Sequence, residues 1–201
     1  MRPRDPKKEK AIRRKALELI VRSGLDGFSM QNLARAARVS PATLYIYFED
    51  RDDLLFQVYR EQAGLMTAEV LRDFNPDGPF ADGLRVQWKN RARHALSHPL
   101  EARFLEQVRH SPYFNPFQAR LPQEFREMMR RFATNAIARK EMRPMPPEIF
   151  WSLVYAPLYQ LIRFSQEEGG FFRALHGGGK FELTDAILEN TLQGVLRAVR
   201  P

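Results

Sequence analysis

Four side chains in one short stretch are suited to contacting a nucleic acid. They are Thr43, Tyr45, Ile46 and Tyr47. If this stretch forms a two-turn helix, Leu44 and Phe48 lie four residues apart on its inner face and the other four face outward. Hydroxyl groups and an apolar side chain on an exposed helix fit phosphate oxygens and base edges. The alternative is that the two tyrosines only cover the core of a small domain.

Two short helices joined by a tight turn would hold these side chains. Ser29 is a suitable N-cap for the first helix, and apolar residues follow it at helical spacing. Ser40 is a second N-cap, and Pro41 stands at the first helical position, where its missing N–H removes no hydrogen bond. Only the turn Arg38-Val39-Ser40 separates the two helices. The pattern predicts a helix-turn-helix whose second helix enters a DNA groove.

Composition and charge agree with a DNA-binding protein. The 201 residues have a net charge of +8, and the first 22 hold nine basic residues against three acidic ones. This basic arm is expected to lie along phosphates or in a minor groove, although basic N-termini are often only solvated. The chain has no cysteine, no long apolar stretch and no secretory signal. We therefore expect a cytoplasmic protein.

The remaining pattern is helical, and the expected fold is all-α. A first helix begins at Asp5-Pro6, and a fourth begins at Asp50 and runs as far as Phe74. Further helices are expected near residues 81–97, 100–110, 122–140, 147–168 and 182–199, with a kink at Pro157. Residues 1–50 then form a three-helix helix-turn-helix DNA-binding domain. Residues 51–201 form a helical effector-binding and dimerisation domain.

Aromatic residues are frequent in the second domain and are candidates for a ligand cavity. The candidate ligand-binding residues are Trp88, Phe104, Phe132, Trp151, Tyr155 and Tyr159. Such residues could also form a dry core. His94 and His98 are one helical turn apart, the spacing of two metal ligands, but a solvated or core pair is the favoured interpretation. No nucleophile motif or phosphate-binding loop is present, so we expect no catalytic residue, no metal ligand and no cofactor.

Residues 8–59 resemble the DNA-binding domain of the TetR (tetracycline-repressor) family of transcriptional regulators. The segments that carry the resemblance are Gly27-Phe28, Ser29, Leu33-Ala34, Val39-Ser40, Thr43-Leu44-Tyr45-Ile46-Tyr47-Phe48 and Asp50-Arg51-Asp52-Asp53-Leu54. One departure is Arg38, since the family usually has Gly in the turn. A side chain there costs roughly 1 to 2 kcal/mol if the left-handed conformation is kept.

The resemblance implies which residues contact DNA. Thr43, Tyr45 and Tyr47 would touch phosphates or bases, Arg51 would hold a phosphate, and Gln31 would read a base. The complete expected DNA-binding set is Gln31, Arg38, Ser40, Pro41, Ala42, Thr43, Tyr45, Ile46, Tyr47 and Arg51.

The resemblance also implies a homodimer and a small-molecule effector. In this family the last two helices pair with those of a second subunit as a four-helix bundle. The broad apolar faces of residues 149–162 and 183–199 fit that role, although both faces could instead pack within one subunit. The aromatic residues suggest an apolar or aromatic effector.

The function expected from the sequence is that of a ligand-responsive, homodimeric repressor that binds a palindromic operator. One alternative is a ligand-independent DNA-binding activator or architectural protein. Another is an enzyme on a helical scaffold, which would need a convergent set of titratable groups that the sequence does not offer. The sequence leaves the operator, the effector and the regulated genes open.

Overall fold

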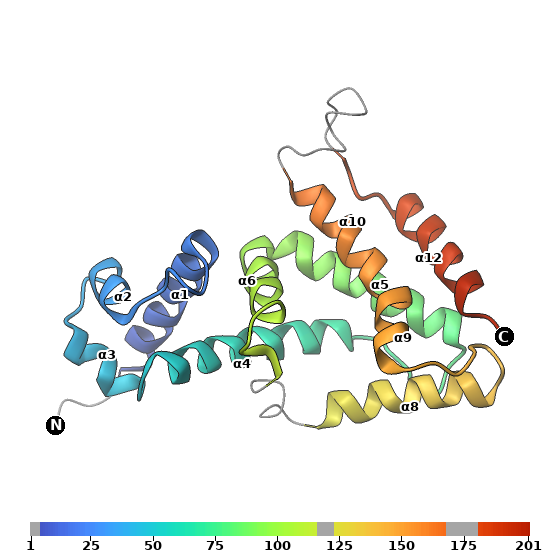
Figure 1. Cartoon of the computed structure of the whole chain (residues 1–201), viewed down its shortest axis with the longest axis horizontal. Helices are drawn as coiled ribbons and strands as arrows, with labels where there is room; N and C mark the ends of the chain where they lie inside the picture. Colours follow the sequence, from blue (N-terminus) through green and yellow to red (C-terminus); the bar gives the residue numbers. More distant parts are fainter. Residues whose placement is uncertain (1–4, 116–122, 168–180) are drawn as a thin grey trace. The chain divides into compact units, whose positions relative to one another are not determined.

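The computed structural model describes residues 5–115, 123–167 and 181–201, and its regular elements are all helices (Figure 1). The helices are α1 (Pro6–Ser23), α2 (Met30–Ala36), α3 (Pro41–Tyr47), α4 (Arg51–Val70), α5 (Phe80–Ser97), α6 (Pro99–Arg109), α8 (Glu124–Ala138), α9 (Pro147–Val154), α10 (Ala156–Gln166) and α12 (Asp185–Val199). This confirms the all-α fold with an N-terminal helix-turn-helix. None of these helices is long and apolar enough to span a bilayer.

Contacts divide the chain into two compact units. Of the described residues, the first unit holds 5–66 and 98–115, and the second holds 67–97, 123–167 and 181–201. The division differs from the boundary expected after residue 50, because most of α4 and all of α6 belong to the first unit. The units are defined by which residues pack together, whereas the sequence pattern indicated only the residue at which α4 begins.

The first unit has a continuous apolar core. In it, α1 packs against α2 and α6, and α2 packs against α3. The largest fully buried side chains include Leu33, Leu44 and Phe48 from the helix-turn-helix and Leu54 and Leu55 from α4. Each buried apolar side chain of this size stabilises the folded state by about 1.5 to 3 kcal/mol relative to leaving it exposed to water. The helix-turn-helix is therefore fixed on a packed base.

The start of α4 is held by reciprocal caps. The carboxylate of Asp50 accepts from the N–H of Asp53 at 2.8 Å, and the carboxylate of Asp53 accepts from the N–H of Glu49 at 3.0 Å. Acidic groups also interact favourably with the helix dipole at this end. These caps confirm that a new helix begins here and fix its start relative to α3.

The second unit is built around α5. This helix packs against α8, α10 and α12, while α9 packs against α10 and α12. Gly83 lets α5 approach α8, since a Cβ placed there would lie 2.5 Å from the ring of Phe132. The ring of Phe132 also stacks on that of Phe80 and makes a T-shaped contact with that of Phe74. The close contact of α5 and α8 therefore depends on a position without a side chain.

The single helix expected at 147–168 is in fact two helices. The first, α9, ends at Val154, and α10 begins at Ala156 with Pro157 in its first turn. Proline has no N–H to donate, and its ring collides with the carbonyl group four residues earlier. The sequence indicated the right residue but too small an effect, because the chain breaks at Tyr155 instead of bending.

Candidate nucleic-acid interface and ligand site

The turn between α2 and α3 has the geometry of a helix-turn-helix. The hydroxyl of Ser29 accepts from the N–H of Asn32 at 3.2 Å, and the hydroxyl of Ser40 accepts from the N–H of Thr43 at 3.2 Å. Both expected N-caps are therefore confirmed. Arg38 has a φ of 55°, which is the left-handed conformation that the turn requires. The turn keeps its shape despite the strain of a side chain at this position.

The exposed side of this motif consists mainly of the expected residues. Tyr45 is 57% exposed and Ile46 is 41% exposed. Thr43 is half-buried, and its hydroxyl bonds the hydroxyl of Ser40 at 2.8 Å. The other exposed residues of the set are Gln31, Arg38, Ser40, Pro41 and Ala42. We call the residues Ser40 to Thr43, Tyr45 and Ile46 the α3 surface.

Tyr47 lies inward, contrary to the sequence expectation. Its side chain is 6% exposed, and its hydroxyl accepts a hydrogen bond from the backbone N–H of Asp5 at 3.2 Å. Tyr47 follows Leu44 by three residues, so the two share one face of α3 and both are buried. The expectation was wrong because it placed only Leu44 and Phe48 on the inner face. Tyr47 instead joins α3 to the start of α1.

Arg51 is held by several protein groups. Its guanidinium donates to the carbonyl of Leu25 at 2.6 Å, to that of Phe28 at 3.2 Å, and to the hydroxyl of Tyr113 at 2.5 Å. It also lies over the rings of Phe28 and Tyr113, and it pairs with Asp52. Through these bonds Arg51 ties the start of α4 to the α1–α2 loop.

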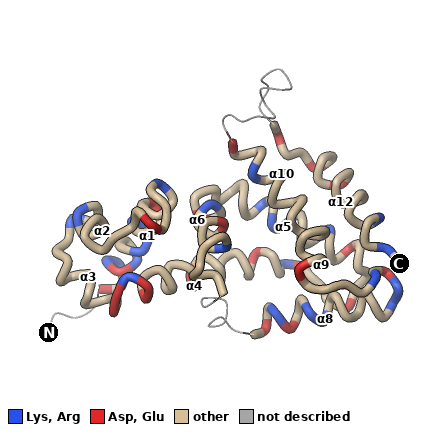
Figure 2. The backbone as a smooth tube through the Cα atoms, viewed as in Figure 1, with Lys and Arg blue, Asp and Glu red and all other residues tan. Residues whose placement is uncertain are grey.

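One basic residue of α2, Arg35, was missed by the sequence reasoning. A groove of about 310 Å³ lies between α1 and α2, and its walls include Arg22, Asn32 and Arg35. Figure 2 shows basic positions along α1 and α2, and acidic positions at the start of α4. Arg35 follows Gln31 by four residues, so the two lie on one exposed face of α2. This four-residue spacing could have identified Arg35 from the sequence. Its positive charge lies near the α3 surface.

Three of the six expected ligand residues form one aromatic cluster in the second unit. The ring of Trp151 stacks on that of Tyr159 at 5.7 Å between centroids and packs on that of Tyr155 at 5.2 Å. Trp151 is 37% exposed, whereas Tyr155 is 3% exposed. The cluster therefore extends from the interior to the surface of the unit.

The other three expected ligand residues lie elsewhere. Trp88 is buried, and its indole N–H donates to the carbonyl of Val154 at 3.0 Å. Phe132 belongs to the separate group with Phe74 and Phe80. Phe104 is part of the apolar core of the first unit. Its helix, α6, packs against α1.

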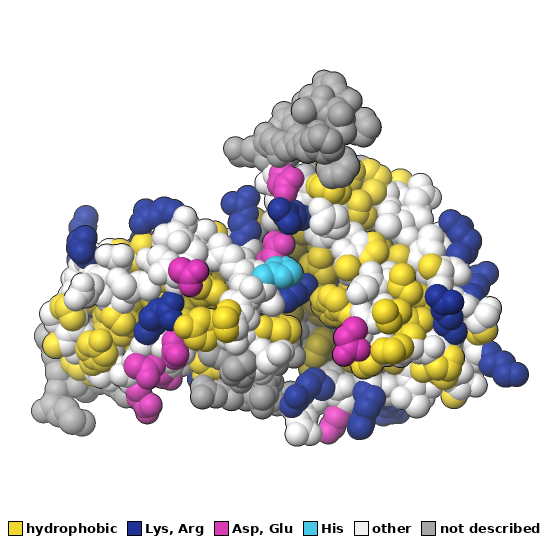
Figure 3. Space-filling model, viewed as in Figure 1, with side chains coloured by type: hydrophobic (Ala, Val, Ile, Leu, Met, Phe, Trp, Pro, Cys, Tyr) yellow, Lys and Arg dark blue, Asp and Glu magenta, His cyan; other side chains and the backbone are white. Residues whose placement is uncertain are grey.

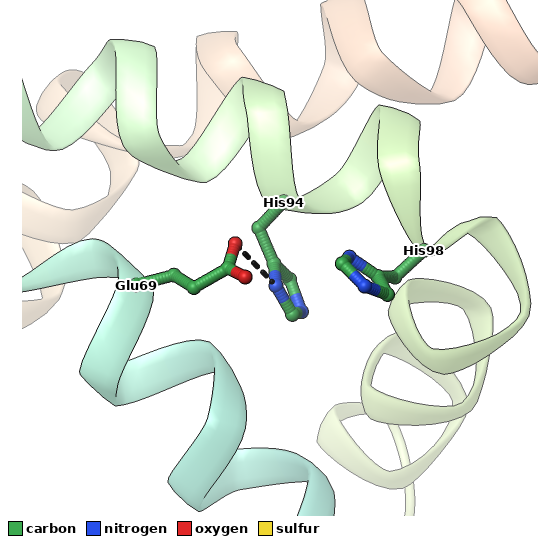
Figure 4. A group of neighbouring side chains, drawn as sticks. All are labelled: Glu69, His94 and His98. Atoms are coloured by element: carbon green, nitrogen blue, oxygen red, sulfur yellow. Dashed lines mark hydrogen bonds and ion pairs between the residues drawn. The ribbon is translucent and has the colours of Figure 1, made fainter.

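The two histidines differ in their environments. His94 is buried, and its Nδ1 lies 3.2 Å from a carboxylate oxygen of Glu69, as Figure 4 shows. His98 is exposed and stands at the N-cap position of α6. The interpretation of these two histidines as a solvated or core pair stays a prediction.

Comparisons with known proteins connect this geometry to a family. Residues 12–58 match the family model described as bacterial regulatory proteins of the tetR family. An uncharacterized HTH-type transcriptional regulator of Haemophilus influenzae is 38% identical over 72 residues. That match covers 36% of this chain and only 38% of the length of the relative.

Solved structures extend the similarity over the whole chain. A TetR family transcription regulator from Marinobacter aquaeolei VT8 is 27% identical, with a TM-score of 0.71, and the match covers 100% of this chain and 99% of that one. A TetR-family transcriptional regulator from Haemophilus influenzae Rd is 25% identical, with a TM-score of 0.73 and 97% of each chain covered. A structure from Shewanella sp. PV-4, described as a tetR family transcription regulator, is 18% identical with a TM-score of 0.77 over 96% of this chain and 98% of that one, and it supports the fold alone.

Proposed function

Because residues 12–58 match the tetR family model and solved TetR family regulators share the fold, we propose that this chain is a regulator of that family, a homodimeric repressor that binds a palindromic operator and releases it when a small molecule binds. The observation that carries the proposal is the α3 surface, where a tyrosine and an isoleucine are exposed on a short helix with both ends fixed. Contact with DNA explains their exposure.

In the proposed complex, α3 lies in the major groove. Tyr45 and Thr43 contact phosphates or base edges, and the apolar side chain of Ile46 contacts a thymine methyl group. Gln31 is suited to the N6/N7 edge of adenine, and Arg35 and Arg38 are suited to the backbone. Tyr47 and Arg51 are not part of the proposed contact set, since protein groups occupy their polar atoms.

This DNA-binding role can be tested with a matched pair of variants. The operator is first selected from a random DNA pool, and its affinity is then measured by fluorescence anisotropy. Tyr45→Ala should weaken operator binding at least about ten-fold, while the fold stays intact. Leu65→Ala is the control, because Leu65 is also a large hydrophobic residue, 56% exposed, on α4 of the same unit. Equal affinities for the two variants would contradict the assignment of the α3 surface.

A second subunit is proposed to pack on α10 and α12. These two helices contact each other, and in Figure 3 hydrophobic side chains gather over the region of α9, α10 and α12. Gly194 stands in the middle of α12 with open space where a Cβ would be. Glycine weakens a helix by about 0.5 to 1 kcal/mol relative to alanine, and close approach of another helix is a reason to keep it.

The dimer is tested by introducing bulk where the single subunit has room. Gly194→Arg should leave the subunit folded and yield monomers in sedimentation experiments, because the new side chain would occupy the space of the second subunit. Gly64→Arg is the control, since Gly64 also has open space around it but lies on α4. If the Gly194→Arg protein stays dimeric, the interface lies elsewhere.

The proposed response to a ligand uses the continuity of α4. This helix begins beside the helix-turn-helix, and its last residues, from Thr67 onward, belong to the second unit. A ligand that changes the packing around its end would alter the separation of two reading helices, which must match major grooves about 34 to 36 Å apart. A ligand-independent DNA-binding protein is the second candidate. It would keep the same operator affinity in the presence of every metabolite.

A further inference from the structure

One face of α5 is polar although it is buried. The buried polar residues among those described are Gln87, Asn90, Arg91 and His94, with exposed fractions between 0% and 8%. They follow one another at the i, i+3, i+4 and i+7 spacing that normally carries the apolar stripe of a packed helix. Burial of polar groups is unfavourable unless hydrogen bonds replace those to water. Each of the four therefore needs a partner.

Three of these residues have partners that explain their burial. The side-chain amide of Asn90 donates to the carbonyl groups of Val70 at 3.3 Å and Arg72 at 2.8 Å. Gln87 also donates to the carbonyl of Val70. His94 faces the carboxylate of Glu69 (Figure 4). The bonds from Gln87 and Asn90 satisfy carbonyl groups at and just after the end of α4, which lack partners within the helix.

Arg91 is different, because its charge is not neutralised. Its guanidinium donates to the hydroxyl of Tyr159 at 2.8 Å and to the amide oxygen of Gln87 at 3.1 Å, and it lies 4.6 Å from the centre of the Tyr155 ring. All three partners are uncharged. Within the part of the chain that the structure describes, no carboxylate pairs with Arg91. A buried cation without a counter-ion is strongly unfavourable.

Two more hydrogen-bonding groups lie at this place. Among the described residues, the Nε atom of Arg91 and the hydroxyl of Tyr155 are buried and have no hydrogen-bond partner of good geometry, although the two groups interact electrostatically with each other. Burial raises the pKa of Tyr155, so its hydroxyl keeps its proton at neutral pH and remains a donor. At Arg91 and Tyr155, the described residues thus offer a positive charge without a counter-ion and two donors for a ligand.

We propose that Arg91 and Tyr155 bind the carboxylate of a small organic acid, and that this acid is the effector. The Nε–H of Arg91 and the hydroxyl of Tyr155 would donate to the two carboxylate oxygens, and the negative charge would neutralise the guanidinium. Two donors fit a carboxylate better than a phosphate group, whose additional oxygens would need further partners. This inference rests on the proposed ligand response and names the chemical class of the ligand.

The body of the acid is apolar or aromatic in this proposal. The aromatic cluster of Trp151, Tyr155 and Tyr159 adjoins the guanidinium and reaches the surface at Trp151. An acid that enters beside Trp151 would replace contacts between these rings with contacts between the rings and the acid. The carboxylate would then stand at the inner end, beside Arg91.

Direct binding tests the inference without DNA. Octanoate, benzoate and indole-3-acetate are titrated into the full-length protein by calorimetry, each beside its amide: octanamide, benzamide and indole-3-acetamide. At least one acid should bind saturably, with an affinity at least about ten-fold higher than that of its amide. Quenching of tryptophan fluorescence should accompany binding, since Trp151 is one of only two tryptophans. Equal binding of acid and amide, or no saturable binding by any of the acids, would overturn the proposal.

Matched variants locate the site. Arg91→Met should weaken binding of the acid about ten-fold or more, whereas Arg93→Met, an exposed arginine on the same helix, should not change it. If Arg91→Met does not fold, Arg91→Lys replaces it, because lysine keeps the charge but has no Nε–H in the same position. Undiminished acid binding in the Arg91 variant would refute the assignment.

The operator experiment separates this inference from the proposed function. If an acid binds at Arg91 but operator affinity is the same with and without it, the site is real and the proposed ligand response fails. If the protein binds its operator and other molecules release it while no acid binds, the proposed function stands and this inference fails.

Discussion

Replacing Arg51 distinguishes a structural residue from a DNA contact. Arg51→Ala removes charge-assisted hydrogen bonds to the carbonyl groups of Leu25 and Phe28 and a bond to the hydroxyl of Tyr113. Hydrogen bonds of a charged donor contribute about 1.5 to 3 kcal/mol each. Because the side chain is 31% exposed, we take the low end for the two backbone bonds and expect a loss of about 3 kcal/mol in the free energy of unfolding.

Urea unfolding measures this loss, and the salt dependence of operator binding provides the comparison. Arg51→Lys keeps the positive charge but cannot form the same fork of bonds, so its unfolding midpoint should also fall while the salt slope stays unchanged. A phosphate contact would behave in the opposite way. Removing it would lower the slope of log affinity against log salt by about 0.9 and leave the stability unchanged. A lowered salt slope and unchanged stability in Arg51→Ala, together with unchanged stability in Arg51→Lys, would refute the structural role.

Three further changes test other parts of the structure. Tyr47→Phe should lower the free energy of unfolding by about 0.5 to 1.5 kcal/mol through loss of the bond to Asp5, and unchanged urea unfolding would argue against that bond. Gly83→Ala should destabilise the protein by about 1 to 3 kcal/mol because of the contact with Phe132, whereas Gly64→Ala, in open space, should stabilise it by up to about 1 kcal/mol; equal thermal shifts would contradict the packing. The Arg85 guanidinium donates two hydrogen bonds of 3.0 Å to the Glu189 carboxylate and lowers its pKa from 4.5 to about 2. The pair therefore stabilises the fold above about pH 4.5, and this stabilisation is lost as the pH falls toward 2. Since Glu189 is 38% exposed, Glu189→Gln should cost no more than about 1 kcal/mol at neutral pH, and a difference from wild type that persists at pH 2 would exclude this linkage.

Local structure was largely determined by the sequence alone. Ser29, Ser40 and Pro41 begin helices because a cap and a proline act on their own backbone neighbours. The left-handed conformation of Arg38 follows from the short turn, which leaves the chain few other routes. These features need no information about distant residues, and the structure confirms them.

Side-chain roles were decided by the tertiary structure. Tyr47 turned inward because the start of α1 supplies a donor for its hydroxyl, and Arg51 is bound because the α1–α2 loop presents two carbonyl groups to it. The aromatic residues separated into different cores because α6 packs on α1 while α9 packs on α10 and α12. The lone buried charge of Arg91 also depends on which helices cover α5. A sequence pattern shows which face of a helix is buried, but the groups that meet that face come from remote segments, and only folding brings them together.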